Sequence, residues 1–118
     1  MYRFYWYPKC STCKKAKAWL DAHHTDYQVV DMIADTPSAE TIEEWLTHNE
    51  IPMRRLFNTS GMKYRELGLK DQIADFSVKK ASAVLSTDGM LIKRPLIVKD
   101  KQLVAIGFNE KTYEGVLI

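Results

Sequence analysis

The sequence FYWYPKCSTCKKAKAWL, which spans residues 4–20, decides the fold. An aromatic run over residues 4–7 stops at Pro8, Cys10 and Cys13 follow, and apolar residues then recur at helical spacing among lysines. This order predicts a strand, a turn, a dithiol and a helix. Because Cys10 and Cys13 are the only cysteines in the sequence, they can react only with each other or with a thiol or disulfide of another molecule.

A C-x-x-C pair beside a strand–helix–strand pattern is typical of a redox dithiol. At the entrance of a helix, Cys10 would face unpaired backbone N–H groups and the positive end of the helix dipole, which favour the thiolate. We therefore expect Cys10 to be the nucleophile and Cys13, one turn later, to be the resolving thiol. Two alternatives stay open: half of a zinc site, for which His23, His24 and His48 fit no familiar spacing, or two inert buried cysteines.

Composition limits the class of protein. A chain of 118 residues with 46% hydrophobic and 27% charged residues is the size of one globular domain. A net charge of +2 is too small to indicate nucleic-acid or membrane binding, and the sequence has neither a membrane-spanning apolar run nor a secretory signal pattern. We expect a monomer in the cytoplasm, with its cysteines mostly reduced and with no bound metal, nucleic acid or membrane.

Hydrophobic periodicity predicts a strand at the start of the chain, a helix over residues 11–24 and a second strand over residues 27–33. Because a helix connects these two strands, they should be parallel. The further elements expected along the chain are helices over residues 38–50, 63–67 and 77–85, a strand over 96–98, a hairpin turn at 99–102, a return strand over 103–106 and a closing helix from Asn109.

These elements predict one α/β domain over residues 1–118, with a thioredoxin-like sheet of the glutaredoxin type. Residues 1–34 form its βαβ part, residues 35–89 an all-helical insert and residues 90–118 its ββα part. In that architecture the strand that follows Arg94 and Pro95 lies beside the dithiol, so we predict that Pro95 is cis. The alternative is an ordinary trans proline at the start of a strand.

Four motifs are distributed over the whole chain: Pro8-x-Cys10-x-x-Cys13, Tyr64-x-x-Leu67-Gly68-Leu69, Leu91-Ile92-Lys93-Arg94-Pro95 and Gly107-Phe108-Asn109-Glu110. Together they resemble the motifs of the arsenate reductase family, which includes glutaredoxin-coupled arsenate reductases and the Spx and MgsR regulators. The likeness is greatest to the uncharacterised YusI-type members from bacilli.

The resemblance implies that Cys10 is the catalytic nucleophile and that Arg94 assists it. Two further arginines of the family's oxyanion site have no counterpart, because Asn58 stands in one place and residues 105–107 carry no cation at the other. Glutathione is the candidate electron donor, and no other cofactor is expected. The residues that we expect to bind substrate are Ser11, Thr12, Lys14, Asn58 and Pro95.

We rank a thiol–disulfide oxidoreductase or redox switch first, acting on a thiol or disulfide substrate or on a redoxin partner. An Spx-like regulator that binds RNA polymerase ranks second, because residues 51–53 (Ile-Pro-Met) lack the glycine-bearing turn that those regulators place at the polymerase contact. A glutaredoxin-coupled arsenate reductase ranks third, because an arsenate dianion needs several charge-assisted donors.

Overall fold

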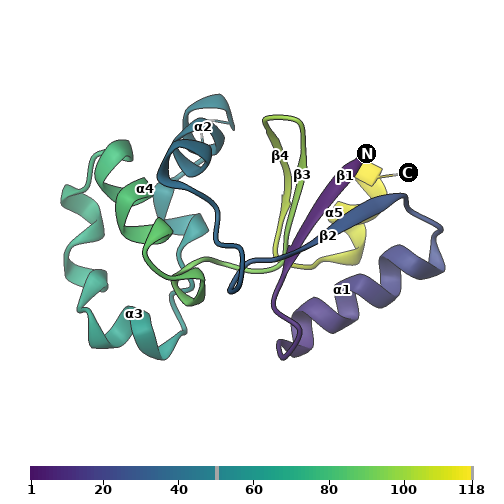
Figure 1. The fold of residues 1–118 in the computed structure, drawn as a ribbon, viewed down its shortest axis with the longest axis horizontal. Coiled ribbons are helices and arrows are strands. Elements are labelled where there is room, and N and C mark those ends of the chain that lie inside the picture. Colours follow the sequence, from purple (N-terminus) through teal and green to yellow (C-terminus); the bar gives the residue numbers. More distant parts are fainter. Residues whose placement is uncertain (50, 118) are drawn as a thin grey trace. The chain divides into compact units, whose positions relative to one another are not determined.

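The chain folds into two compact units in the computed structural model, which describes residues 1–49 and 51–117 (Figure 1). The first unit combines Met1–Met32 with Arg94–Ile118, and the second is the continuous segment Ile33–Lys93. The second unit contains residues 35–89, where the sequence predicted an insert, together with residues 33–34 and 90–93.

The first unit contains a four-stranded sheet with the strand order β2-β1-β3-β4. β1 pairs in parallel with β2 and antiparallel with β3, and β3 pairs antiparallel with β4. The helix α1 connects β1 to β2, and the predicted parallel pairing of these two strands is confirmed. The predicted thioredoxin-like fold class is confirmed as well. The bounds are β1 (Tyr2–Trp6), α1 (Ser11–Ala22), β2 (Tyr27–Asp31), β3 (Leu96–Lys99), β4 (Gln102–Ile106) and α5 (Glu110–Leu117).

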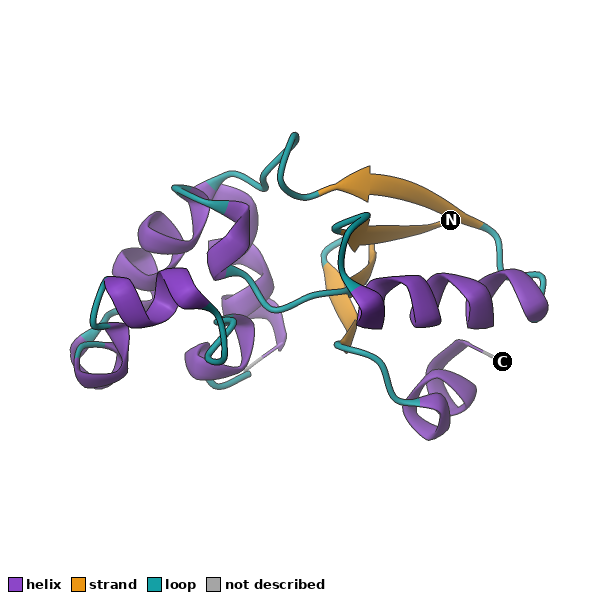
Figure 2. Cartoon of the chain, turned by 90° about the horizontal axis from the view of Figure 1, so that it is seen from below, coloured by secondary structure: helices purple, strands orange, loops and turns teal. Residues whose placement is uncertain are grey.

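A row of apolar residues crosses one face of this sheet in register. Phe4 on β1 pairs with Val29 on β2 and Ile97 on β3, and Ile97 pairs with Ala105 on β4. Figure 2 shows α1 and α5 on the same side of the strands. The side chains that form the core between them are Phe4, Ala16, Trp19, Leu20, Ile97, Ala105 and Tyr113.

The regular elements described in the second unit are all helices, with one isolated β-bridge between Phe57 and Ile92. Its α-helices are α2 (Ala39–Asn49), α3 (Met62–Glu66) and α4 (Val78–Ser86). The 3-10 helices η1 (Met53–Leu56), η2 (Leu69–Asp71), η3 (Ile73–Asp75) and η4 (Gly89–Leu91) connect them. Helices of three or four residues are too short to produce a periodic pattern, so the sequence did not predict them. The expected end of α2 at Glu50 lies outside the described residues.

Helix packing and a short backbone ladder hold the second unit together. α2 packs against α4, and Trp45 and Leu85 are buried there. Between the middle of the unit and its C-terminal end, the Asn58 N–H donates to the Leu91 carbonyl at 2.7 Å and the Lys93 N–H donates to the Leu56 carbonyl at 2.7 Å. This ladder fixes the segment that leads directly into Arg94.

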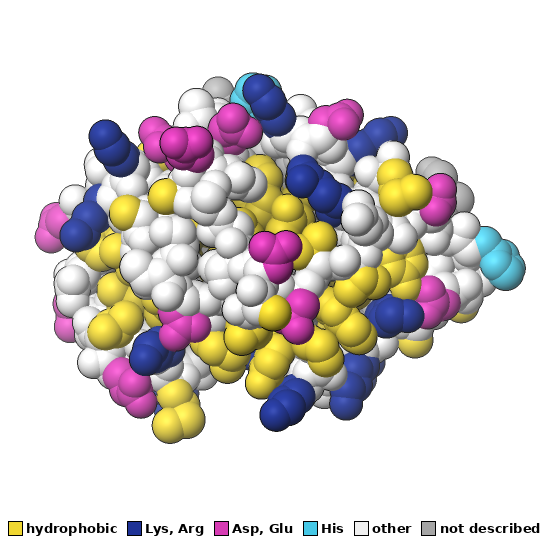
Figure 3. All heavy atoms as spheres, in the orientation of Figure 1, with side chains coloured by type: hydrophobic (Ala, Val, Ile, Leu, Met, Phe, Trp, Pro, Cys, Tyr) yellow, Lys and Arg dark blue, Asp and Glu magenta, His cyan; other side chains and the backbone are white. Residues whose placement is uncertain are grey.

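Lysine, arginine, aspartate and glutamate side chains are interspersed on the face of the molecule shown in Figure 3. A nucleic-acid site is usually marked by a large patch of positive charge, and the described residues on the face in Figure 3 form no such patch. None of the helices that the structure describes is both long enough and apolar enough to cross a bilayer.

The fold analysis predicts that Tyr113→Phe lowers the free energy of unfolding by about 1 kcal/mol. The buried Tyr113 hydroxyl donates to the Gly107 carbonyl at 2.7 Å, and the substitution removes this bond. Urea unfolding measures the change. Tyr27→Phe is the matched control, because it removes an exposed bond to Asp21 and should have a smaller effect. Equal effects of the two substitutions would contradict the prediction.

Candidate functional site

Cys10 lies at the start of α1, in the position that the sequence predicted. It is the N-cap residue of α1, with extended backbone angles and no side-chain cap. A tight turn sets this position, because the Cys10 N–H donates to the Tyr7 carbonyl at 2.9 Å and the Lys14 N–H donates to the Cys10 carbonyl at 3.1 Å. The Cys10 side chain is partly exposed and that of Cys13 is fully buried, and both are free thiols.

The two sulfur atoms interact directly and have opposite pKa shifts. Burial alone would raise the pKa of Cys10, but hydrogen bonds from the Cys13 backbone and thiol and from Arg94, together with the charge of Arg94, lower it below its ordinary value of 9.0. Burial raises the pKa of Cys13 to about 12, and the neighbouring Cys10 adds to this increase. The site therefore favours one thiolate, on Cys10, and one protonated thiol, on Cys13.

Arg94 reaches the dithiol from the segment before β3. The Arg94–Pro95 peptide bond is cis, as predicted, and the Gly107 N–H donates to the Pro95 carbonyl at 2.8 Å. The Arg94 guanidinium carbon lies 5.2 Å from the centre of the Tyr7 ring. Its Nε and Nη1 atoms are buried and have no hydrogen-bond partner among the residues that the structure describes.

Tyr7 and Tyr113 are site residues that the sequence analysis missed. The Tyr7 ring covers the Arg94 guanidinium in a cation–π contact. Burial, together with the charge of Cys13, raises the pKa of Tyr113, which places this residue near the resolving thiol. An aromatic residue just after a strand, such as Tyr7, or within a helix, such as Tyr113, carries no signal in the sequence that it contacts a distant arginine or cysteine, so only the tertiary structure could identify these two.

The structure brings most of the expected site residues into one unit. Ser11 and Thr12 begin α1, Lys14 follows in its first turn, and all three are exposed. Asn58 belongs to the second unit, where the Ser60 hydroxyl donates to its side-chain oxygen at 3.4 Å. No group of three or more potential metal ligands occurs in residues 1–49 and 51–117. The substrate-binding roles of Ser11, Thr12, Lys14, Asn58 and Pro95 stay predictions.

The sheet order, the crossover helix and the dithiol at the start of α1 define a thioredoxin-like protein with a C-x-x-C site. The chain belongs to the ArsC family, whose model matches residues 5–116, so the resemblance predicted from the motifs is confirmed.

The chain is 43% identical over 111 residues to an uncharacterised protein, YusI, of Bacillus subtilis, covering 94% of this chain and 93% of that one. It is 30% identical over 117 residues to the global transcriptional regulator Spx 2 of Lactococcus lactis, covering 99% of this chain and 86% of the regulator. The crystal structure of a possible arsenate reductase from Streptococcus mutans superposes with a TM-score of 0.89 at 48% identity, covering 92% of each chain. Similarity therefore extends to relatives with different names and does not by itself select an activity.

The opposite pKa shifts predict that iodoacetamide alkylates Cys10 much faster than Cys13 at neutral pH. The Cys10 rate should rise with pH, with the midpoint of the rise below the ordinary thiol pKa of 9.0, because the thiolate is the reacting form. Cys13, with a pKa near 12, should still be protonated there. Peptide mapping after short exposures across a pH series measures both rates. Equal rates at the two cysteines would contradict the assigned roles.

The contact between Tyr7 and Arg94 predicts that Tyr7→Leu slows Cys10 alkylation at neutral pH by a factor of about two to five. This factor corresponds to the loss of a cation–π contact worth about 0.5–1 kcal/mol, which holds Arg94 in place beside Cys10. Tyr7→Phe keeps the ring and should react like the unsubstituted protein.

In an Arg94→Met background, Tyr7→Leu should have no further effect, because the two residues act through one contact. Additive losses in this double-mutant cycle would show that Tyr7 acts independently of Arg94.

Proposed function

We propose that this protein is a thiol–disulfide redox protein in which Cys10 is the nucleophile and Cys13 is the resolving thiol. The observation that carries the proposal is the pair of opposite pKa shifts on two thiols in hydrogen-bond contact. A low-pKa, partly exposed thiol beside a buried partner thiol is the arrangement that thiol–disulfide exchange needs.

The proposed cycle has two exchange steps. First, the Cys10 thiolate attacks one sulfur of a substrate disulfide, a Cys10–substrate mixed disulfide forms, and the other substrate sulfur leaves as a thiolate. Cys13 then loses its proton and attacks the Cys10 sulfur, which releases the second substrate sulfur and forms the Cys10–Cys13 disulfide. Two electrons pass from the dithiol to the substrate in this cycle.

Arg94 has two roles in this proposal. Its positive charge stabilises the Cys10 thiolate, and it stabilises the same sulfur when Cys10 becomes the leaving group on reduction of the protein disulfide. Glutathione, or a redoxin, is the proposed donor of the two electrons that regenerate the dithiol. We place the cycle in the cytoplasm, where thiols are kept reduced.

The exposed start of α1 supports a negatively charged substrate. Ser11, Thr12 and Lys14 are exposed beside Cys10, and the first turn of α1 has no acidic residue. The helix dipole and Lys14 then favour a substrate with a carboxylate close to its disulfide. We further propose that the Pro95 backbone and the Asn58 side chain bind the substrate.

Arsenate reduction fits this geometry less well than disulfide exchange. Two of the three guanidinium nitrogens of Arg94 are buried, and the Tyr7 ring packs against the guanidinium. These two nitrogens have no hydrogen-bond partner among the described residues, but a single guanidinium supplies only some of the charge-assisted hydrogen bonds that an arsenate dianion needs. Asn58 and residues 105–107 add no further cation. For this reason arsenate stays third among the proposed substrates.

A redox-switched regulator is the second candidate function. This chain is 30% identical to a protein named as a global transcriptional regulator, and the likeness covers 99% of this chain. The same Cys10–Cys13 disulfide would act as the switch, and RNA polymerase is the partner that the resemblance suggests. Affinity capture of RNA polymerase by the oxidised and the reduced protein distinguishes this function from catalytic exchange.

The proposed function predicts that mild oxidation with diamide converts the protein into a monomer lighter by two hydrogen atoms, with Cys10 joined to Cys13. Intact mass spectrometry and non-reducing electrophoresis measure this product. Cys13→Ser should accumulate mixed disulfides on Cys10, because no internal thiol resolves them. Cys10→Ser should react slowly, since burial keeps Cys13 protonated. Predominantly intermolecular disulfides in the unsubstituted protein would refute internal resolution.

A further inference from the structure

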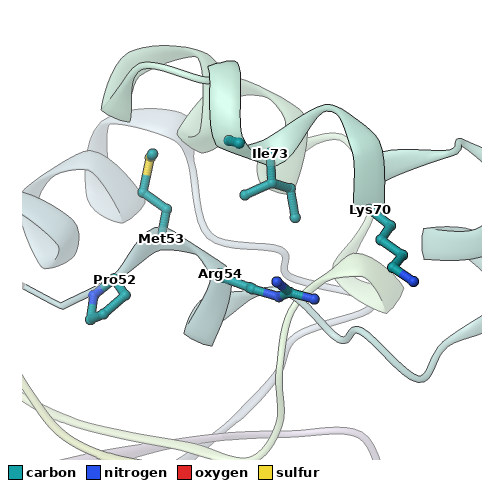
Figure 4. Close-up of a pocket in the computed structure, with 6 residues that line it drawn as sticks. Pro52, Met53, Arg54, Lys70 and Ile73 are labelled. Atoms are coloured by element: carbon teal, nitrogen blue, oxygen red, sulfur yellow. The ribbon is translucent and has the colours of Figure 1, made fainter.

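A pocket in the second unit lies outside the dithiol site. Its volume is about 310 Å³, at the lower end of the range of about 300–1,000 Å³ that is common for small-molecule sites. Figure 4 shows the Arg54 side chain extending toward the side of the pocket on which Lys70 lies, with Ile73 above Arg54. The residues that line it are Pro52, Met53, Arg54, Lys70, Ile73 and Ala74.

Short-range backbone contacts build both walls of this pocket. One wall is η1, whose turn closes when the Arg55 N–H donates to the Pro52 carbonyl at 3.0 Å. The other wall is η2 with η3, which begin after Gly68, a residue in the left-handed region with φ 62°. The Gln72 side-chain amide donates to the Leu67 carbonyl at 2.9 Å and to the Gly68 carbonyl at 3.2 Å. The walls are thus held by hydrogen bonds that do not depend on a ligand.

The pocket combines an apolar lining with two uncompensated cations. Ile73 is only 7% exposed, and Pro52, Met53 and Ala74 continue the apolar surface. Among the residues that the structure describes, neither Arg54 nor Lys70 makes an ion pair. Asp71 and Asp75 are close to Lys70 in the sequence, but they do not line the pocket.

Two like charges beside one pocket repel each other, and an anion held between them removes that repulsion and gains attraction to both. The apolar lining at the same time favours a ligand with a hydrocarbon body, since its burial removes apolar surface from water. A small anion without a hydrocarbon part would use only the cations, and a neutral hydrocarbon would use only the lining.

We propose that this pocket binds a small organic anion, with its carboxylate between Arg54 and Lys70 and its hydrocarbon part against Pro52, Met53, Ile73 and Ala74. This site is independent of the dithiol chemistry. Because both cations are exposed, binding is weak, with a dissociation constant on the order of 1 mM.

Two-dimensional NMR of the ¹⁵N-labelled full chain tests this proposal with four probes. Octanoate carries both the charge and the hydrocarbon chain, acetate carries only the charge, octanamide carries only the chain, and octylamine reverses the charge. We expect octanoate to cause saturable shifts in the amide signals of residues 53–54 and 70–74, with weaker binding at higher salt. Acetate, octanamide and octylamine should cause no saturable shift of these signals.

Two single substitutions separate the pocket from its surroundings. Arg54→Gln should weaken octanoate binding by about two- to fivefold, the effect of losing one exposed ion pair. Arg55→Gln is the matched control, because Arg55 is the next residue of η1 and is also exposed but does not line the pocket. Its octanoate affinity should equal that of the unsubstituted protein. Both substitutions are at exposed positions, and the NMR spectrum itself reports whether the fold is kept.

The proposal is overturned if octanoate gives no saturable shift in the millimolar range, if octanamide or octylamine binds as well as octanoate, or if Arg54→Gln and Arg55→Gln weaken binding equally. None of these outcomes affects the dithiol assignment, because the alkylation and oxidation experiments report on Cys10 and Cys13 alone.

Discussion

The hydrogen bonds that converge on the Cys10 sulfur are the interaction on which the rest of the site depends. They come from three places: the backbone N–H of Cys13, the thiol of Cys13 and the side chain of Arg94. Burial opposes ionisation of both thiols, so without these bonds neither sulfur would ionise easily. With them, the negative charge is favoured on Cys10 and disfavoured on Cys13, and the two identical side chains acquire different chemistry.

The fold supplies these donors from two separate parts of the first unit. β1 and the turn after it place Cys10 at the start of α1, and α1 places Cys13 one turn later. Arg94 comes from a distant part of the sequence, because β3 pairs with β1 and brings the two residues before β3, Arg94 and Pro95, beside the dithiol. α5 contributes through two linked hydrogen bonds. The Tyr113 hydroxyl donates to the Gly107 carbonyl, and the Gly107 N–H donates to the Pro95 carbonyl. The closing helix is thereby connected to the backbone that carries Arg94.

The helical insert interrupts the sheet-forming sequence without adding a strand to the sheet. Its own helices bury their apolar faces against one another, as α2 and α4 do around Trp45 and Leu85. The ladder between residues 56–58 and 91–93 pairs the middle of the insert with its C-terminal end. The insert also contains the cationic pocket, so the two units carry sites of different chemistry, one for sulfur and one for an organic anion.

The sequence by itself determined the features that depend on local pattern. The aromatic run, Pro8 and the C-x-x-C spacing predicted β1, α1 and the position of Cys10 at the start of α1, and the helical and alternating periodicities predicted the order of the other main elements. These signals are local because the chemistry at a helix start and the side-chain period of a helix or strand depend on neighbouring residues. The cis state of Pro95 was also predicted, but only through the fold class.

Only the tertiary structure decided the features that depend on residues far apart in the sequence. Tyr7 and Arg94 are separated by most of the chain and meet because β1 and β3 are neighbours. Tyr113 approaches Cys13 because α1 and α5 pack on one face of the sheet. The 3-10 helices that form the pocket of Arg54 and Lys70 have no periodic signature. Side-chain contact across a sheet, and the burial that shifts a pKa, arise from three-dimensional packing, which no local pattern encodes.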